Sequence, residues 1–132
     1  MLKRHDLKYT RPRRLVLRAL ASLKKPCSPY DVQKWIHAKN EAVHVVTIYR
    51  VLETFVRIGI VHRHPCDGHF FLCSLPAQPG HHRFLHCTSC GEVREYLNEA
   101  LCQAEEQCIR SSHFRVHTHV SEFLGTCAAC AA

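Results

Sequence analysis

The stretch Cys87-Thr-Ser-Cys90-Gly91 and a second cysteine pair in Cys127-Ala-Ala-Cys130 constrain this chain more than any other feature of its sequence. Each pair can place two thiolates on one ion, and together they supply the four soft ligands of a closed tetrahedral zinc site. Gly91 suits a turn around the metal because glycine tolerates positive φ. A closed site leaves no position for a substrate, so the sequence predicts a structural zinc. A redox dithiol or a disulfide is the alternative interpretation.

The composition favours an intracellular metal-binding protein. The 132 residues include nine cysteines and 12 histidines. No apolar run approaches the roughly 20 residues of a transmembrane helix, and the first residues lack the apolar core of a signal peptide. Cysteines without an export signal point to metal binding in a reducing cytosol rather than to a disulfide framework. We therefore expect a cytoplasmic protein with no membrane partner.

Charge is unevenly spread along the chain. Residues 1–64 hold 14 Lys and Arg against 4 Asp and Glu, whereas residues 65–132 hold 4 against 7. A basic first half joined to a mildly acidic, ligand-rich second half is typical of a polyanion-binding module followed by a sensing or assembly module. The alternative is a solvated basic face without a function.

The first half has the pattern of a helix-turn-helix. Apolar residues at helical spacing predict a helix over 13–23, and Ser28 is the expected N-cap of a second helix. A third helix is expected over about 46–58, with Gly59 as its stop. Three short helices with tight connections are the layout of a helix-turn-helix. The third helix carries polar side chains outward, namely Thr47, Tyr49 and Arg50.

A hairpin follows these helices. The strand-like runs 60–64 and 70–74 flank Asp67-Gly68, a preferred two-residue turn. Pairing outward from this turn sets His62 opposite Cys73. A hairpin after a helix-turn-helix is a wing, so residues 1–75 are predicted to form a winged-helix DNA-binding domain.

Residues 76–80 are interpreted as a hinge, and residues 81–132 as a second, dimerisation and metal-binding domain. This part is expected to contain two strands, a helix and a last strand, over 83–87, 92–96, about 98–111 and 114–124. Pairing the last strand with the first two would bring the two cysteine pairs together. The predicted fold class is α+β, a winged helix-turn-helix domain followed by a small α/β zinc-containing dimerisation domain.

At this point the residues resemble the ferric uptake regulator family of metal-dependent repressors. Five features occur in the family's order: Thr-Arg-Pro-Arg-Arg (10–14), Val-Thr-Ile-Tyr-Arg-Val-Leu (46–52), Gly-Ile-Val (59–61), Asp-Gly (67–68), and the cysteine pairs preceded by His81-His82 and His119. The chain is most similar to the zinc uptake regulator branch, through Ser28-Pro-Tyr30-Asp31, Leu72-Cys73, Gln78-Pro79-Gly-His81 and the Cys-Ala-Ala-Cys ending. The iron-sensing pattern His-His-Asp-His is broken, because Arg83 and Phe84 replace its last two residues.

The resemblance implies a second, regulatory zinc held by His62, Cys73, His81 and Glu95. The predicted hairpin agrees for the first two, because paired residues on one face lie close together. His82 is an alternative to His81. One thiolate, two imidazoles and a carboxylate suit tetrahedral zinc better than iron or manganese. We therefore expect two zinc ions per chain, one structural and one regulatory.

A third metal is left open by the sequence. His117 and His119, with His113, alternate on one predicted strand face, and the family often uses the residue at His119 for a further metal. Cys102, however, stands where the carboxylate that would complete that site is expected. The remaining cysteines are interpreted as small apolar residues: Cys27, Cys66 and Cys108.

Several side chains are candidates for DNA contact. Arg50 can present a bidentate fork to guanine, and Tyr49 can reach a phosphate or a thymine methyl group. The alternative for Arg50 is a salt bridge to Glu53. Tyr30 resembles a base-contacting position of the zinc branch. Phosphate contacts, which supply affinity without sequence choice, are expected from the basic residues near the first helix: Lys8, Arg11, Arg13 and Arg14.

The function expected from these observations is a zinc-responsive transcriptional repressor, a homodimer that binds double-stranded operator DNA when its regulatory site is filled. The first alternative is an iron, manganese or peroxide sensor on the same fold. A zinc-dependent hydrolase or deaminase would need an open metal position and a general base. The sequence contains neither His-x-Glu nor His-Glu-x-x-His, so an enzyme is not expected.

Overall fold

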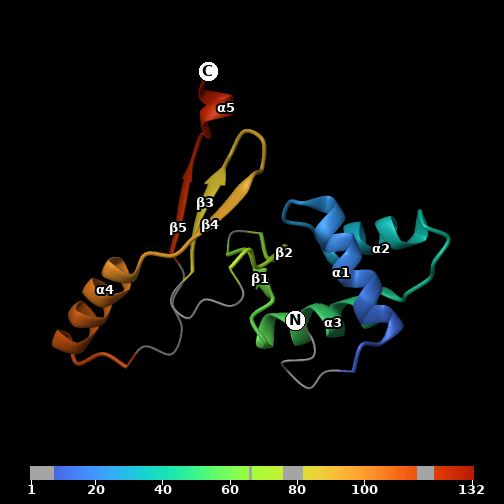
Figure 1. The fold of residues 1–132 in the computed structure, drawn as a ribbon, viewed down its shortest axis with the longest axis horizontal. Helices are drawn as coiled ribbons and strands as arrows, with labels where there is room; N and C mark the ends of the chain where they lie inside the picture. Colours follow the sequence, from blue (N-terminus) through green and yellow to red (C-terminus); the bar gives the residue numbers. More distant parts are fainter. Residues whose placement is uncertain (1–7, 66, 76–81, 116–120) are drawn as a thin grey trace. The chain divides into compact units, whose positions relative to one another are not determined.

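The computed structural model describes residues 8–65, 67–75, 82–115 and 121–132 (Figure 1). The chain divides into two units, Met1–Pro76 and Ala77–Ala132. The hinge predicted at 76–80 lies outside the described residues. No helix in the described ranges has both the length and the apolar character needed to cross a membrane.

The N-terminal unit contains three helices, α1 (Arg11–Leu23), α2 (Pro29–His37) and α3 (Val45–Arg57). They match the three helices that apolar spacing predicts. Their apolar faces meet in one buried core, which includes Val16, Val32 and Leu52. The burial of apolar side chains is the main favourable term in folding. This core therefore fixes how α3 lies against α1 and α2, and with it the direction in which the outer face of α3 points.

A capping box starts α2. The Ser28 hydroxyl accepts a hydrogen bond from the Asp31 backbone N–H at 3.2 Å, and the Asp31 carboxylate accepts one from the Ser28 N–H at 2.8 Å. These bonds pair backbone N–H groups that have no partner within the helix. Hydrogen bonds from the Ser28 side chain and backbone lower the pKa of Asp31 below 3.8.

We expect Ser28→Ala to lower the free energy of unfolding by about 1 kcal/mol, because an N-cap bond is lost. The carboxylate of Asp31 has a lowered pKa in the folded state, so its contribution is present above 3.8 and is lost as the pH falls below that value. Urea unfolding at several pH values measures both effects. Ser22→Ala, an exposed change inside α1, is the matched control. Equal stability of the two variants would contradict the cap.

A two-stranded hairpin follows α3, formed by β1 (Val61–Arg63) and β2 (Phe70–Leu72). This arrangement of three helices and a hairpin is the predicted winged helix-turn-helix. The predicted register is wrong, since His62 lies opposite Phe71 and not opposite Cys73. The Cys73 N–H instead donates to Ile60 O at 3.0 Å.

The register differs because Asp67-Gly68 is not a two-residue hairpin turn. The His64 N–H donates to His69 O at 2.7 Å, so the turn is longer than two residues. The pairing of the two strands is therefore shifted by two positions from the predicted register. The Asp67 carboxylate accepts from the His69 N–H and contacts His64 Nδ1, both at 2.9 Å. A shift of two residues keeps every side chain on its face. His62 and Cys73 therefore still share one face of the wing.

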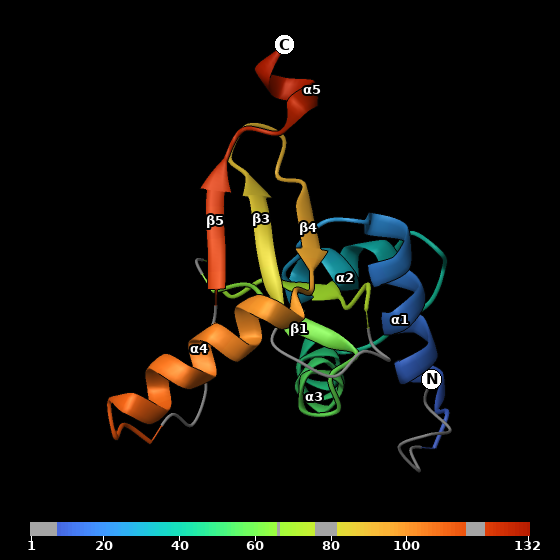
Figure 2. The same ribbon diagram turned by 60° about the vertical axis from the view of Figure 1, so that its left-hand side comes forward.

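The C-terminal unit is built on a three-stranded sheet in the order β4-β3-β5. β3 (Arg83–Cys87) runs antiparallel to β4 (Val93–Tyr96) and parallel to β5 (Ser121–Gly125) (Figure 2). The predicted strands 83–87 and 92–96 match β3 and β4 closely. The predicted strand 114–124 is shorter in its described part, because Phe114 and Arg115 lie outside β5.

Two helices complete this unit. The helix predicted over 98–111 is α4 (Glu99–Ser111), capped by the Asn98 side chain, which accepts from the Leu101 N–H at 3.1 Å. A short helix, α5 (Ala128–Ala131), follows Cys127 and was not predicted. Together the two units confirm the predicted α+β fold class.

Candidate metal centres and nucleic-acid interface

The two cysteine pairs converge at one end of the C-terminal sheet. The parallel register sets Cys87 beside Gly125, two residues before Cys127. The Thr88 N–H donates to Gly125 O at 2.9 Å, and Gly91 has a φ of 74°. The sulfur atoms of the four cysteines lie within 4.8 Å of one another: Cys87, Cys90, Cys127 and Cys130.

This cluster fits zinc. A tetrahedral ion with Zn–S bonds of about 2.3 Å separates its sulfur ligands by about 3.8 Å. The Sγ atoms of Cys90 and Cys127 are 3.8 Å apart. Because four soft donors surround one point, the cluster can hold a closed metal centre, and such a centre offers no substrate position.

Local hydrogen bonds prepare one of these thiols to ionise. The Cys127 N–H donates to Cys87 Sγ at 3.3 Å. Backbone donors, that of Cys127 foremost, lower the pKa of Cys87 to about 6. Side-chain hydrogen bonds with Cys127 and Cys90 raise the pKa of Cys130 to about 12. Adjacent thiolates repel one another, so full ionisation of the cluster requires a cation.

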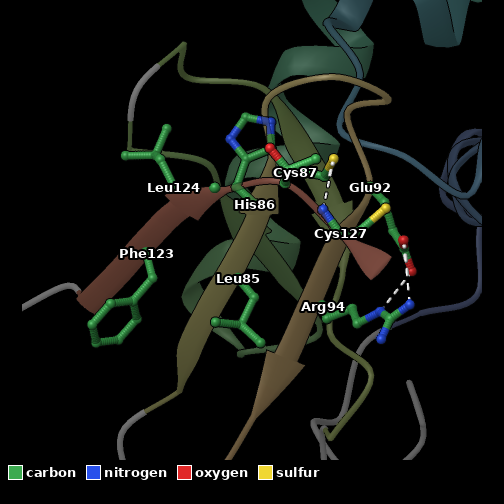
Figure 3. A pocket seen from close by; sticks show the side chains of 10 residues that line it. Leu85, His86, Cys87, Glu92, Arg94, Phe123, Leu124 and Cys127 are labelled. Carbon is green, nitrogen blue, oxygen red and sulfur yellow. Dashed lines mark hydrogen bonds and ion pairs between the residues drawn. The ribbon is translucent and has the colours of Figure 1, made fainter. Parts of the chain in front are cut away.

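A pocket of about 200 Å³ adjoins the cysteine cluster (Figure 3). Leu85 of β3 and Phe123 of β5 are neighbours in register and lie side by side in it. The Arg94 Nε donates to the Glu92 carboxylate at 2.7 Å, and this bond lowers the pKa of Glu92. The pocket is largely apolar and adjoins the four-cysteine cluster through Cys87 and Cys127.

The predicted regulatory ligands fall into two pairs, one in each unit. On the wing, the ligand atoms of His62 and Cys73 lie within 4.8 Å of each other. In the C-terminal unit, His82 Nδ1 contacts the Glu95 carboxylate, whose side chain is 3% exposed. His82, the alternative to His81, is thus the described histidine beside Glu95. His81, His117 and His119 lie outside the described residues.

The C-terminal unit also contains a second histidine–carboxylate pair that the sequence does not predict. His86 Nδ1 lies 3.5 Å from Glu122 Oε1 across β3 and β5. Phe84 pairs with Glu122 and with Glu95, so the same sheet face carries both acidic residues. Aligning 83–87 with 121–125 in register would have revealed this pair. The sequence alone does not specify that register.

The candidate nucleic-acid interface lies in the N-terminal unit. Residues from α1, from α3 and from the segment before α1 line an open groove of about 460 Å³. Three of its lining residues are basic: Lys8, Arg13 and Arg50. The Arg13 guanidinium donates to Lys8 O at 2.7 Å, and Thr47 also lines this groove.

The other predicted DNA contacts are placed around this groove or on neighbouring helices. Tyr49 on α3 and Tyr30 on α2 are both exposed. Arg14 is exposed on α1, whereas Arg11 forms an ion pair with Glu41. Arg50 forms no ion pair with any described residue. The alternative partner Glu53 instead contacts Arg63 at 3.5 Å.

Comparisons with known proteins agree with this architecture. A model of the ferric uptake regulator family matches residues 4–123. A ferric uptake regulation protein of Legionella pneumophila is 35% identical over 130 residues, which cover 98% of this chain and 95% of that protein.

Solved structures give the same result. A zinc uptake regulator complexed with zinc and DNA has a TM-score of 0.87 at 27% identity, covering 98% of this chain and 87% of that chain. A ferric uptake regulator from Pseudomonas aeruginosa with manganese has a TM-score of 0.62 at 30% identity, covering 96% and 95%. The chain therefore belongs to the ferric uptake regulator family, whose members are metal-binding and DNA-binding regulators of transcription.

Proposed function

We propose that this family member is a zinc-responsive repressor, a homodimer that binds double-stranded operator DNA when a regulatory zinc is present. The observation that carries the proposal is the donor set. A thiol lies beside an imidazole on the wing, and another imidazole lies beside a carboxylate in the C-terminal unit. Thiolate and imidazole ligands suit zinc, whereas iron and manganese sensors favour harder donors. The TM-score of 0.87 to a zinc uptake regulator supports the same metal.

The structural zinc of the proposal is held by Cys87, Cys90, Cys127 and Cys130, and the regulatory zinc by four further residues: His62, Cys73, His82 and Glu95. His82 takes the place first given to His81, because its imidazole lies against Glu95. With both pairs on one ion, the wing would be tied to the C-terminal unit. A ligand shifts an equilibrium between two arrangements only by its differential affinity for them. In the proposal, zinc favours the arrangement that fits the operator.

Homodimerisation is part of the proposal and rests on the C-terminal unit. β5 is an edge strand of the described sheet, and Phe123 and Leu124 are 55% and 58% exposed. Leu101 on α4 is 45% exposed. An edge strand with exposed apolar side chains is a surface that a second chain can cover. A dimer would also place two copies of α3 on two half-sites.

The DNA contacts of the proposal divide by role. We expect Arg50→Ala to cost about 1–3 kcal/mol of binding free energy and to relax discrimination at one base position. Arg13→Ala should weaken binding to all sequences and flatten the dependence of affinity on salt. Fluorescence anisotropy with matched and single-base-changed duplexes separates the two effects. If both variants lost affinity uniformly, Arg50 would not read a base.

Metal selectivity tests the proposal against its alternative, an iron, manganese or peroxide sensor. A duplex is first selected from a random pool with zinc-loaded protein, and its affinity is then measured in buffered zinc, ferrous iron or manganese. We expect zinc to raise the affinity at far lower free metal than iron or manganese. An equal or stronger response to iron or manganese would favour the alternative. The proposal assigns no catalytic step, and it places the protein in the reducing cytosol, where thiolate ligands persist.

A further inference from the structure

The junction between β3 and α4 contains a buried cation. The Arg83 side chain is 2% exposed. Its guanidinium donates to the Glu105 carboxylate at 2.5 Å and to Cys102 Sγ at 3.5 Å. Both acceptors belong to α4 and are three positions apart, so they share one face of that helix. A buried charge is tolerated only when such partners compensate it.

These contacts matter because α4 makes few contacts with the other helices and strands that the structure describes. None of its residues is buried within the described part of the chain. Figure 2 shows α4 starting close to the end of β4 and extending away from the sheet. Cys102 and Glu105 lie in its first two turns, near the sheet. Among the described residues, apolar packing therefore contributes little to the position of this helix, and the Arg83 contacts contribute more.

The side chains that accept hydrogen bonds from Arg83 are of the kind that also bind metal ions. A thiol and a carboxylate on one helix face are ligands for zinc, yet here they surround a guanidinium. Arginine stays protonated at all physiological pH values and spans two acceptors with its planar fork. Its charge therefore depends on neither zinc supply nor pH.

We propose that Arg83 is a built-in cation that docks α4 onto β3 in place of a metal ion. Arg83 is a positioning residue in this account. Its guanidinium occupies the two side chains of α4 that could otherwise serve as metal ligands, Cys102 and Glu105. In this proposal, no third metal therefore binds between β3 and α4. The docking of α4 is independent of zinc at the regulatory site. This inference holds whether or not the proposed zinc response is correct, because it concerns one junction inside the C-terminal unit.

Hydrogen exchange of the α4 amides tests this role in the full-length protein. In the wild type, chelation down to one zinc per chain should leave exchange over 99–111 unchanged. Arg83→Met removes a charge-assisted bond and should speed this exchange roughly 10- to 100-fold. Arg83→Lys keeps the charge and should restore part of the protection. Arg110→Met, which removes an exposed α4 charge paired with Glu106, is the control and should change little.

Two results would overturn the inference. One is unchanged α4 exchange in Arg83→Met. The other is that removal of the regulatory zinc from the wild type speeds the exchange of the α4 amides to the rate seen in Arg83→Met. Should Arg83→Met not fold, the double variant Cys102→Ala with Glu105→Gln removes the acceptors from α4 instead. The α4 amides of this double variant should exchange faster than those of the wild type. Exchange at the wild-type rate in the double variant would also overturn the inference.

Discussion

Cys90→Ser is expected to bind about one zinc ion fewer per chain and to lose the folded C-terminal unit together with the dimer. The unfolded chain has no preformed metal site, so the binding free energy of a structural zinc is also folding free energy. Without the metal, the end of β3 at Cys87 would no longer be linked through an ion to Cys127, which follows β5. Elemental analysis, circular dichroism and sedimentation measure metal content, fold and assembly.

Cys108→Ser is the matched control, because Cys108 is an exposed cysteine of α4 outside the cluster. It should keep its zinc and its assembly state. An intact dimer with unchanged zinc content in Cys90→Ser would contradict the structural role of the four cysteines.

Cys73→Ser is expected to abolish the zinc-dependent rise in operator affinity. Typical coupling between two sites on a protein corresponds to about 5–150-fold in affinity, and all of this gain should disappear. The structural zinc, the dimer and weak non-specific DNA binding should remain, because Cys73 lies on the wing and takes no part in the four-cysteine cluster. Anisotropy titrations with the selected duplex at low and high free zinc measure the effect.

The outcomes of this variant separate three accounts. Loss of dimerisation would place Cys73 in the structural site. A fully retained zinc response would mean that sensing runs through another group, for which the predicted His113, His117 and His119 face is the candidate. Loss of the response alone, with Cys108→Ser behaving as the wild type, is the expected result.

Local sequence patterns were enough to predict most elements. Apolar spacing predicted α1 and α3. The N-cap residue Ser28 predicted the start of α2, because a capping box is a local interaction. β3 matches its prediction residue for residue. The four-cysteine cluster was also predictable, because soft ligands in two close pairs have few other uses.

Features that depend on tertiary contacts were not predictable. The wing register depended on how the Asp67 carboxylate binds His64 and His69, and a turn motif alone does not encode that contact. His82 directly precedes β3 and Glu95 lies in β4, so their contact depends on how the two strands pair. The sequence alone therefore could not show which of the adjacent residues His81 and His82 lies beside Glu95. The partners of Arg83 on α4 lie 19 and 22 positions away, beyond any local pattern.

The measurement that tests the account most directly compares operator binding by protein with one and with two zinc ions per chain. Chelation prepares the one-zinc form, and metal analysis confirms each stoichiometry before the titration. The account predicts that the one-zinc form is dimeric yet binds the selected duplex no better than a scrambled duplex. Restoring the second zinc should raise affinity for the selected duplex alone by about 5–150-fold. Equal affinity of the two forms for the selected duplex would contradict a regulatory zinc.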